Sequence, residues 1–371
     1  MKITFDREQF LNAFMTAATV APSRSPKPIL RNVKLEVTKE ASTLMATDME
    51  VGIRIEVAGI VVEKPGTVLA PVSLLGSILR ESSDEKLVIE TDSKGTVVRG
   101  ERSEFKLPAE NPDEFPSVAS FTEEAFHEVP ARLYKELVRR TLFATDAESS
   151  RYALGGVLLE MSEDKITAVA TDGRRLAKME GPAMAVGGHQ TGDAMTIVPS
   201  RAMQLMERAL SDGDAEIQVA ARVNDILVKS ARATIYSRLV EGRFPKWREV
   251  FPTRQESVQI EIAVGPFYSA LRQAAIVASE ESRGIDFSFG GGVLVMAGAT
   301  VEVGQSRVEL PIPYAGDDIT VTLDHRFVAD FLKVLDAEKA VTVDIQDAES
   351  AALFTTDDGY GYVIMPLARD Q

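Results

Sequence analysis

The chain contains no cysteine and only three histidines, His127, His189 and His325. Without cysteine there can be no disulfide framework, no thiol catalysis and no cysteine-ligated zinc. Histidine is the commonest metal ligand and acid–base group, so three of them leave little room for either chemistry. No stretch approaches 18 consecutive apolar residues, and we therefore expect no transmembrane helix and no membrane partner.

The chain also has fewer basic residues than acidic ones. The 371 residues carry 41 Lys and Arg against 56 Asp and Glu, a formal net charge of −15 at pH 7. A protein that holds nucleic acid by simple electrostatic attraction is normally basic, so this balance argues against one. The first seven residues meet an acid before any apolar run develops, and we expect no signal peptide there. We expect a cytoplasmic chain of two or three domains.

One sequence pattern returns along the chain. Ala46-Thr47-Asp48 recurs 124 residues later as Ala170-Thr171-Asp172, an interval of about one third of the length. The last third keeps only part of the tripeptide, as Ala299-Thr300. Repetition at this interval predicts three similar domains rather than one large fold.

Apolar residues at helical spacing predict two amphipathic helices in each third. The six stripes are Phe10, Leu11, Phe14, Met15 and Ala18; Leu74, Leu75, Ile78 and Leu79; Tyr134, Leu137, Val138, Thr141 and Leu142; Ala202, Leu205, Met206, Ala209 and Leu210; Phe267, Leu271, Ala274, Ala275 and Ala278; and Phe327, Val328, Phe331, Leu332 and Leu335. Alternating segments such as 33–37 predict strands between them, and Gly290-Gly291-Gly292 predicts a hairpin turn. The predicted order is helix, strands, helix, strands, three times over, which is an α+β fold.

The predicted helices carry more basic than acidic residues, although the whole chain is acidic. Arg132, Lys135 and Arg139, for example, share one helix face at positions i, i+3 and i+7. A solvated surface is the ordinary explanation for any single helix. The alternative is that the helix faces point at a polyanion while strands and loops face water, and it requires all the helices to face the same way.

The chain offers no convincing active site. It has no G-x-x-x-x-G-K-[ST] phosphate loop, no H-E-x-x-H and no G-x-S-x-G. Asp48 and Asp172 suggest a carboxylate pair, but as equivalent residues of two repeats they are expected to lie apart and each to end a strand. His325, beside Asp324, opens a predicted helix and is interpreted as a surface residue. We predict no catalytic residue, no metal and no cofactor.

Four stretches carry a resemblance that spans the whole chain: Lys27–Val33, Val169–Ala177, Leu239–Pro245 and Tyr362–Leu367. The sequence resembles the bacterial DNA polymerase III beta subunit family, the sliding clamps. The resemblance implies three clamp-type domains, expected at residues 1–120, 121–253 and 254–371. It also implies a head-to-tail dimeric ring, with helices lining the hole and antiparallel sheets outside.

The resemblance implies a non-enzymatic function, in which the ring encircles duplex DNA and tethers the replicative polymerase for processive synthesis. A closed ring suits this role, because phosphate contacts tight enough to hold a protein would also resist sliding and would weaken steeply with salt. The implied partners are double-stranded DNA, a second copy of the chain, the DNA polymerase III catalytic subunit, the clamp loader, repair polymerases, ligase and mismatch-repair proteins.

Three sets of site residues follow from the same resemblance. A pocket for the linear motifs of partner proteins is expected at Leu154, Thr171, Gly173, Arg174, Arg175, Leu176, Pro245, Val250, Val363, Met365, Pro366 and Leu367. The expected DNA contacts are Arg24, Lys27 and Arg151. The dimer interface is expected to join Leu74, Ile78, Leu79 and Phe105 of one copy to Ile276 and Val277 of the other.

Two alternatives stay open on the sequence. One is a clamp paralogue that acts in DNA repair or regulation rather than in replication, and the sequence does not separate the two. The other is a DNA-modifying enzyme built on a clamp-like ring, which a cluster of carboxylates or metal ligands would favour.

Overall fold

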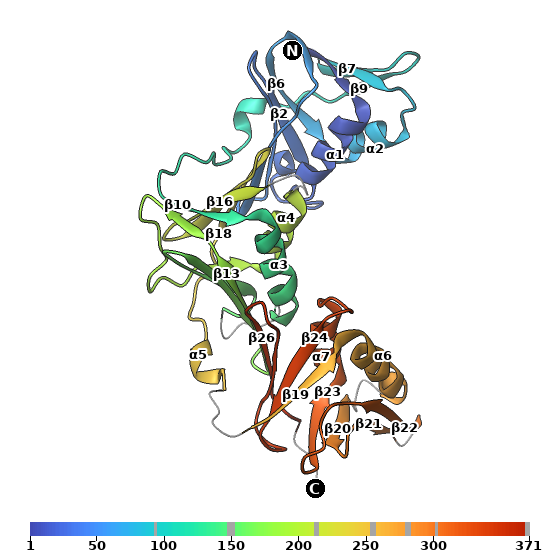
Figure 1. The fold of residues 1–371 in the computed structure, drawn as a ribbon. Coiled ribbons are helices and arrows are strands. Elements are labelled where there is room, and N and C mark those ends of the chain that lie inside the picture. Colours follow the sequence, from blue (N-terminus) through green and yellow to red (C-terminus); the bar gives the residue numbers. More distant parts are fainter. Residues whose placement is uncertain are drawn as a thin grey trace. The chain divides into compact units, whose positions relative to one another are not determined.

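The computed structural model describes residues 1–92, 95–146, 153–210, 215–252, 257–278, 283–300 and 303–367. Its contacts divide the chain into two compact units. The first holds Met1–Lys135, Met161–Asp164 and Ala183–Leu239, and the second holds Glu136–Glu160, Lys165–Pro182 and Val240–Gln371. The middle third of the chain therefore contributes to both units (Figure 1). No described helix is long and apolar enough to cross a membrane.

Two antiparallel sheets, with helices packed on them, form the first unit (Figure 1). One sheet has the order β5 (Val61–Lys64), β1 (Lys2–Asp6), β7 (Lys86–Asp92), β8 (Gly95–Arg99) and β9 (Glu104–Leu107). The other has the order β14 (Met184–Val186), β10 (Phe126–Pro130), β16 (Glu216–Ala221), β17 (Asp225–Lys229), β18 (Ala233–Arg238), β4 (Val51–Glu56), β3 (Ser42–Thr47), β2 (Asn32–Val37) and β6 (Gly66–Pro71). The remaining elements are α1 (Arg7–Ala18), α2 (Val72–Glu81), α4 (Ser200–Ala209), β15 (Ile197–Pro199) and the 3-10 turns η1 (Pro28–Arg31) and η2 (Pro112–Glu114).

The second unit has the same construction. One sheet runs β11 (Gly156–Ser162), β12 (Lys165–Thr171), β13 (Arg175–Pro182), β26 (Tyr360–Ile364), β25 (Ala352–Thr355), β24 (Ala340–Ile345) and β19 (Val258–Ala263). The other runs β22 (Gly304–Pro311), β21 (Val293–Thr300), β20 (Gly284–Gly290) and β23 (Ile319–Asp324). Its other elements are α5 (Trp247–Val250), α6 (Val264–Ala274), α7 (His325–Lys333), η3 (Leu142–Ala144) and η4 (Ala275–Val277), and α3 (Ala131–Thr141) begins in the first unit and ends in the second.

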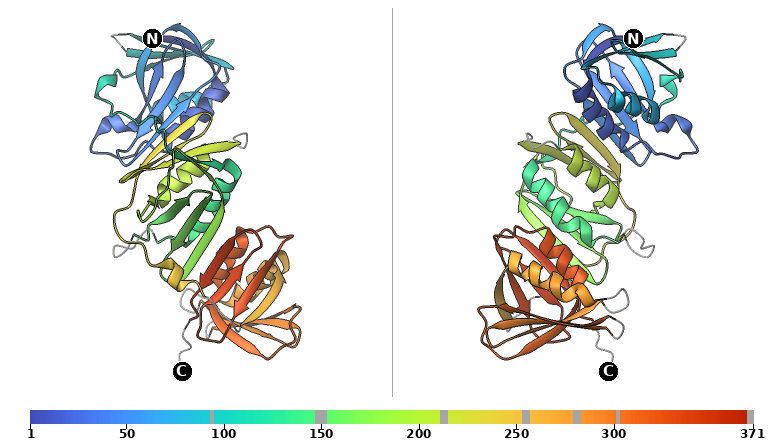
Figure 2. Two further views of the ribbon diagram at one scale, coloured as in Figure 1. Left: turned by 60° about the vertical axis from the view of Figure 1, so that its left-hand side comes forward. Right: turned by 90° about the vertical axis from the view of Figure 1, so that its right-hand side faces the viewer.

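The six predicted amphipathic helices are confirmed as α1, α2, α3, α4, α6 and α7. In α1 the stripe residues Phe10 and Phe14 are buried, whereas Gln9 and Asn12 are exposed. The side chain of Asp6 starts this helix by accepting a hydrogen bond from the backbone N–H of Gln9 at 2.9 Å. The helices pack in pairs within a unit, α1 beside α2 and α6 beside α7 (Figure 2).

The predicted order of elements needs one correction, because a short strand precedes the first helix of each third. These strands are β1, β10 and β19. In β1 only Ile3 and Phe5 are buried, and such a brief alternation is hidden by the stronger helical pattern that follows it. The predicted glycine turn is confirmed between β20 and β21, where Gly291 and Gly292 have φ angles of 57° and 81°.

Aromatic side chains form the centre of each unit. In the first, the rings of Phe5 and Phe10 lie 4.2 Å apart, and Phe14 continues the row. In the second, Phe331 stacks on Tyr362 with centroids 4.9 Å apart. Burying side chains of this size contributes about 1.5–3 kcal/mol each, so these rows fix the helices on their sheets.

Candidate functional site

The strand that ends at Thr171 turns back through a tight hairpin. The side chain of Asp172 accepts hydrogen bonds from the backbone N–H groups of Arg174 (2.9 Å) and Arg175 (3.0 Å). The hydroxyl of Thr171 donates to the carbonyl of Arg175 at 2.6 Å. Gly173 has φ of 89°, in the left-handed region that favours glycine. The turn leaves Gly173 and Arg174 exposed at the end of the sheet.

The first repeat builds the same turn around Asp48. Its side chain accepts from the backbone N–H groups of Glu50 (3.0 Å) and Val51 (2.8 Å), and Thr47 donates to the carbonyl of Val51 at 2.8 Å. Met49, with φ of 83°, takes the place of the glycine. Each of the two aspartates therefore follows the last residue of a strand, as predicted, and its side chain also caps the turn, which was not predicted.

Arg175 joins this turn to helix α7. Its side chain is only 10% exposed, and its guanidinium donates to Asp172 (2.9 Å), to Asp330 on α7 (2.7 Å) and to the carbonyl of Phe143 (2.6 Å). Burial opposes the charge, but contacts with Tyr362 and Asp330 outweigh it and raise the pKa of Arg175 above its ordinary value. A buried charge is tolerated only when it is paired in this way. Arg175 is therefore a positioning residue of the turn.

Four of the predicted pocket residues are buried. Leu176 and Val363 are partners across the β13–β26 ladder, and both are buried. Leu154 and Thr171 are buried as well, so packing within the unit accounts for all four. The apolar surface that a ligand could reach comes from elsewhere.

That surface lies along the last described residues. Met365 is 45% exposed, and Pro366 and Leu367 are half-buried. The backbone N–H of Met365 donates to the carbonyl of Arg174 (2.9 Å), and that of Leu367 donates to Thr322 (2.9 Å). The segment is thus anchored by its backbone while its side chains stay accessible.

The short helix α5 supplies a second accessible part. Val250 is 43% exposed, and Pro245, just before α5, is half-buried. Trp247 and Arg248 tie α5 to Glu160 on β11, at 3.3 Å and 2.7 Å. These contacts were not predicted, because they link residues more than 80 positions apart; the lone tryptophan was the available signal. The structure therefore brings the predicted residues of the turn, β26 and α5 onto one unit.

The predicted DNA contacts are placed in part. Arg24 and Lys27 are exposed between α1 and η1, and Arg151 lies outside the described residues. Among the helix cations, several have structural partners instead: Arg7 donates to backbone carbonyls, Arg201 pairs with Asp48 and Arg326 pairs with Asp324. No acidic partner is found in the described parts of the chain for Arg80, Arg132 and Arg208, which are exposed.

The predicted interface residues fall into two groups. Leu74 (45%), Phe105 (39%) and Ile276 (74%) are exposed apolar side chains, and Val277 is half-buried. Ile78 and Leu79 are buried in the first unit, with Leu79 fully so, and can support such a surface only from beneath. A cavity of about 570 Å³ lies beside Phe105, lined by Ile78 and by acidic residues that include Glu81 and Glu101.

Two of the three histidines form a buried pair that was not predicted. The Nδ1 atoms of His127 and His189 lie 2.7 Å apart, although 62 residues separate them in the chain. The backbone N–H of Ala221 donates to His189 Nε2 (3.0 Å), so the neutral His189 donates from Nδ1 to His127, which donates from Nε2 to the carbonyl of Ser162 (2.5 Å). Every ring nitrogen has a partner, which identifies a structural pair.

Comparison with known proteins gives matches along the whole chain. Three family models match in succession, described as the N-terminal, central and C-terminal domains of the DNA polymerase III beta subunit, at residues 1–119, 128–246 and 248–368. The beta sliding clamp of Streptomyces coelicolor is 30% identical over 385 residues, covering 99% of both chains.

Solved structures agree. The DNA polymerase III beta subunit of Pseudomonas aeruginosa is 27% identical, with a TM-score of 0.89, over 99% of this chain and 100% of that one. A sliding clamp from the same organism, bound to griselimycin, has a TM-score of 0.91 and 27% identity over 99% of each chain.

Proposed function

The chain belongs to the DNA polymerase III beta subunit family and is a sliding clamp, and we propose that two copies close head to tail into its ring around duplex DNA. A clamp is a non-catalytic processivity factor that tethers the replicative polymerase. The observation that carries the proposal is the succession of three clamp domains along one chain. We also place the protein in the cytoplasm, where a bacterial chromosome is replicated.

The edges of two sheets support the dimer. β9 ends one sheet of the first unit and β22 ends a sheet of the second, and unpaired edges of this kind accept another chain. Phe105 lies on β9, and Ile276 lies in η4, which packs beside β22. Joining the two different surfaces would bury both side chains, and a two-fold pair of such contacts closes a ring.

Charge favours the same pairing. The cavity beside Phe105 carries Glu81, Asp84 and Glu101 against one arginine, Arg102. On α6, Arg272 is exposed one helical turn before Ile276. Opposite charges around an apolar centre steer two surfaces into one register.

For DNA, we propose transient phosphate contacts rather than a tight site. Arg24 and Lys27 are the predicted contacts, and the exposed cations Arg80, Arg132 and Arg208 join them from the helices. Few contacts on a chain of net charge −15 give weak, salt-sensitive attraction. Topological linkage, not affinity, then keeps the ring on DNA.

For partner proteins, we propose that linear motifs bind along the turn at Gly173 and Arg174, the exposed side chain of Met365 and the face of α5 that carries Val250. Methionine adapts to different apolar anchors, which suits a surface used by several partners. The polymerase catalytic subunit, the clamp loader, repair polymerases, ligase and mismatch-repair proteins are the proposed ligands.

Retention on DNA of two topologies tests the function. The protein is loaded onto a nicked circular DNA with a clamp loader, washed at high salt, and the circle is then cut by a restriction enzyme. We expect the protein to survive the wash on the circle and to leave once the DNA is linear. Equal loss from circular and linear DNA would show ordinary electrostatic binding and refute a closed ring.

A further inference from the structure

Each unit contains the same crevice, built from equivalent elements of the repeat. The strand that follows the aspartate-capped turn pairs with the second strand of another hairpin: β4 with β18 in the first unit, and β13 with β26 in the second. Ile55 therefore faces Ala233 in one register, and Met179, its equivalent, faces Tyr360 in the other. The contents of the two crevices can be compared side chain by side chain.

In the second unit the chain fills the crevice itself. Arg140 lies over the ring of Tyr360, 5.2 Å from its centroid, and donates to Asp358 at 2.7 Å. It also forms an ion pair with Glu136 at 2.9 Å, one helical turn earlier. Tyr360 is buried, and its hydroxyl donates to the carbonyl of Arg140 at 2.7 Å.

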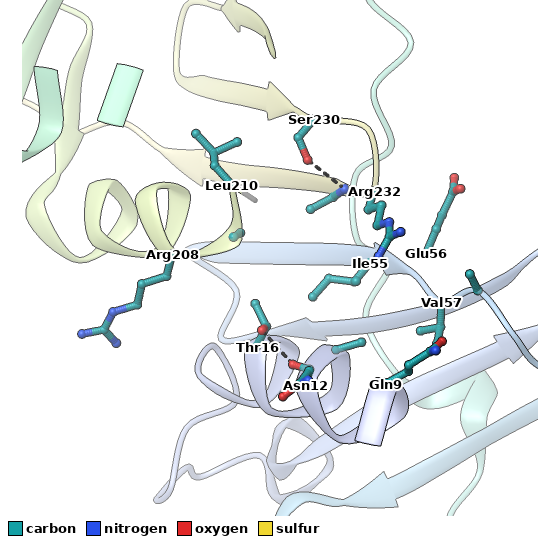
Figure 3. Close-up of a pocket in the computed structure, with 14 residues that line it drawn as sticks. Gln9, Asn12, Thr16, Ile55, Glu56, Val57, Arg208, Leu210, Ser230 and Arg232 are labelled. Carbon is teal, nitrogen blue, oxygen red and sulfur yellow. Dashed lines mark hydrogen bonds between the residues drawn. The ribbon is translucent and has the colours of Figure 1, made fainter. Parts of the chain in front are cut away.

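In the first unit the equivalent residues are too small to fill the crevice. The replacements are Asn12 for Glu136, Thr16 for Arg140 and Ala233 for Tyr360. A cavity of about 530 Å³ remains between α1, the end of α4, the end of β4 and the turn before β18 (Figure 3). This volume lies within the ~300–1,000 Å³ typical of small-molecule sites.

The lining combines apolar and polar side chains. Ile55, Val57 and Leu210 line the cavity, and the amides of Gln9 and Asn12 reach it from α1. A primary amide offers both a donor and an acceptor, as the edge of a nucleobase requires.

Charged residues also line the cavity. Arg208 lies on one side of the group of lining side chains, and Arg232 lies on the other side near Glu56 (Figure 3). Both arginines are exposed, and neither has an acidic partner within the residues that the structure describes. Two guanidinium groups against one carboxylate favour an anionic ligand.

We propose that this cavity binds one unpaired nucleotide of a DNA single strand. The base takes the space that the ring of Tyr360 occupies in the other unit, and the amides of Gln9 and Asn12 meet its edge. The phosphates on either side of the nucleotide meet Arg208 and Arg232, since guanidinium groups bind phosphate oxygens well. The inference rests on the proposed clamp function, which brings the protein to DNA.

Refilling the cavity tests the inference. The full-length protein is titrated into a short fluorescein-labelled oligothymidylate, and anisotropy gives the affinity. The double variant N12E/T16R rebuilds the Glu136–Arg140 pair in the first unit, and we expect binding about tenfold weaker. Arg208→Gln and Arg232→Gln, both at exposed positions, should each weaken it several-fold. Lys39→Gln, which removes one exposed charge from the turn between β2 and β3, should leave it unchanged.

The outcomes separate the possible ligands. If free thymidine monophosphate displaces the oligonucleotide completely, the cavity is a site for a free nucleotide. If it does not compete, and the variants bind the oligonucleotide more weakly, the cavity binds a DNA single strand. Unchanged affinity in the refilled variant and in both arginine variants would overturn the inference, as would a loss seen only with a linear peptide. The refilled variant should be retained on circular DNA as well as the native protein is. Failure of the nucleotide proposal can therefore be distinguished from failure of the clamp function.

Discussion

Met49 holds the left-handed position of the first hairpin turn, where glycine holds it in the second. A residue with a Cβ atom pays about 1–2 kcal/mol there, and the side chain of Met49, 44% exposed, regains little by packing. We expect Met49→Gly to raise the free energy of unfolding by about 1 kcal/mol, because relief of strain exceeds the added entropy of the unfolded chain. Chemical denaturation measures it, with Gly173→Met as the reverse change; a destabilised Met49→Gly variant would contradict the turn geometry.

The histidine pair gives the first unit a pH dependence. Burial lowers the pKa of His189 below its ordinary value of 6.5; the neighbouring His127 adds to the lowering, and Glu123 acts in the opposite direction. The folded state thus resists protonation, so its contribution to stability is complete above about pH 6.5 and is lost as the pH falls through the folded pKa.

We expect the melting temperature of the native protein to fall across this window more steeply than that of a His189→Gln variant. Glutamine keeps a donor and an acceptor for its neighbours but does not titrate. Differential scanning calorimetry at a series of pH values makes the comparison. Parallel curves for the two proteins would remove the pair as the cause.

At the scale of elements, sequence prediction succeeded where the pattern was long. Each helix stripe, such as that of Phe10 and Phe14, repeats over several turns and is confirmed. The strands of five or six residues before the first helices were missed, because two buried residues are too few to establish an alternation. The prediction that Asp48 and Asp172 each end a strand is confirmed, whereas the hydrogen bonds by which they cap the turns were seen only in the structure.

The contacts that form the candidate site could not be predicted from local sequence patterns. Arg175 and Asp330 are 155 residues apart, and Trp247 and Glu160 are 87 apart, so no local pattern connects them. The predicted pocket residues came from the resemblance alone, and only the structure shows which of them are buried and which are exposed. Leu176 is buried, which makes it a poor position at which to test binding.

Met365 is the better position. We expect Met365→Ala to weaken binding of a peptide with Leu and Phe anchors by about tenfold, because one buried anchor contact is typically worth 1–2 kcal/mol. Isothermal titration calorimetry gives the affinity. Met184→Ala is the matched control, since Met184 is 56% exposed on β14 of the first unit and should not touch the peptide. Equal peptide affinity in both variants would refute the proposed role of Met365 in the pocket.

At the scale of the whole molecule, equivalent parts of the repeat differ in structure between the two units. The capped turn is kept in two copies, but the crevice beside it is filled by Arg140 and Tyr360 in one unit and left open in the other. Charge is also unevenly distributed over this acidic chain. Three exposed arginines on helices, Arg80, Arg132 and Arg208, have no acidic partner within the described residues. A ring needs only such sparse contacts with DNA.

Closure of that ring depends on few apolar side chains. Ile276, 74% exposed, is the most exposed of them, and Ile276→Asp would place a charge in the proposed interface. A buried charge without a partner costs several kcal/mol, so we expect monomers of 40.4 kDa at micromolar concentration, where we expect the native chain to form dimers. Analytical ultracentrifugation distinguishes the two masses. Val223→Asp, at a residue 89% exposed on the first unit, is the control and should remain dimeric. The Ile276→Asp monomer should also be lost from circular DNA at high salt, because an open chain has no topological hold; a dimeric Ile276→Asp variant would place the interface elsewhere.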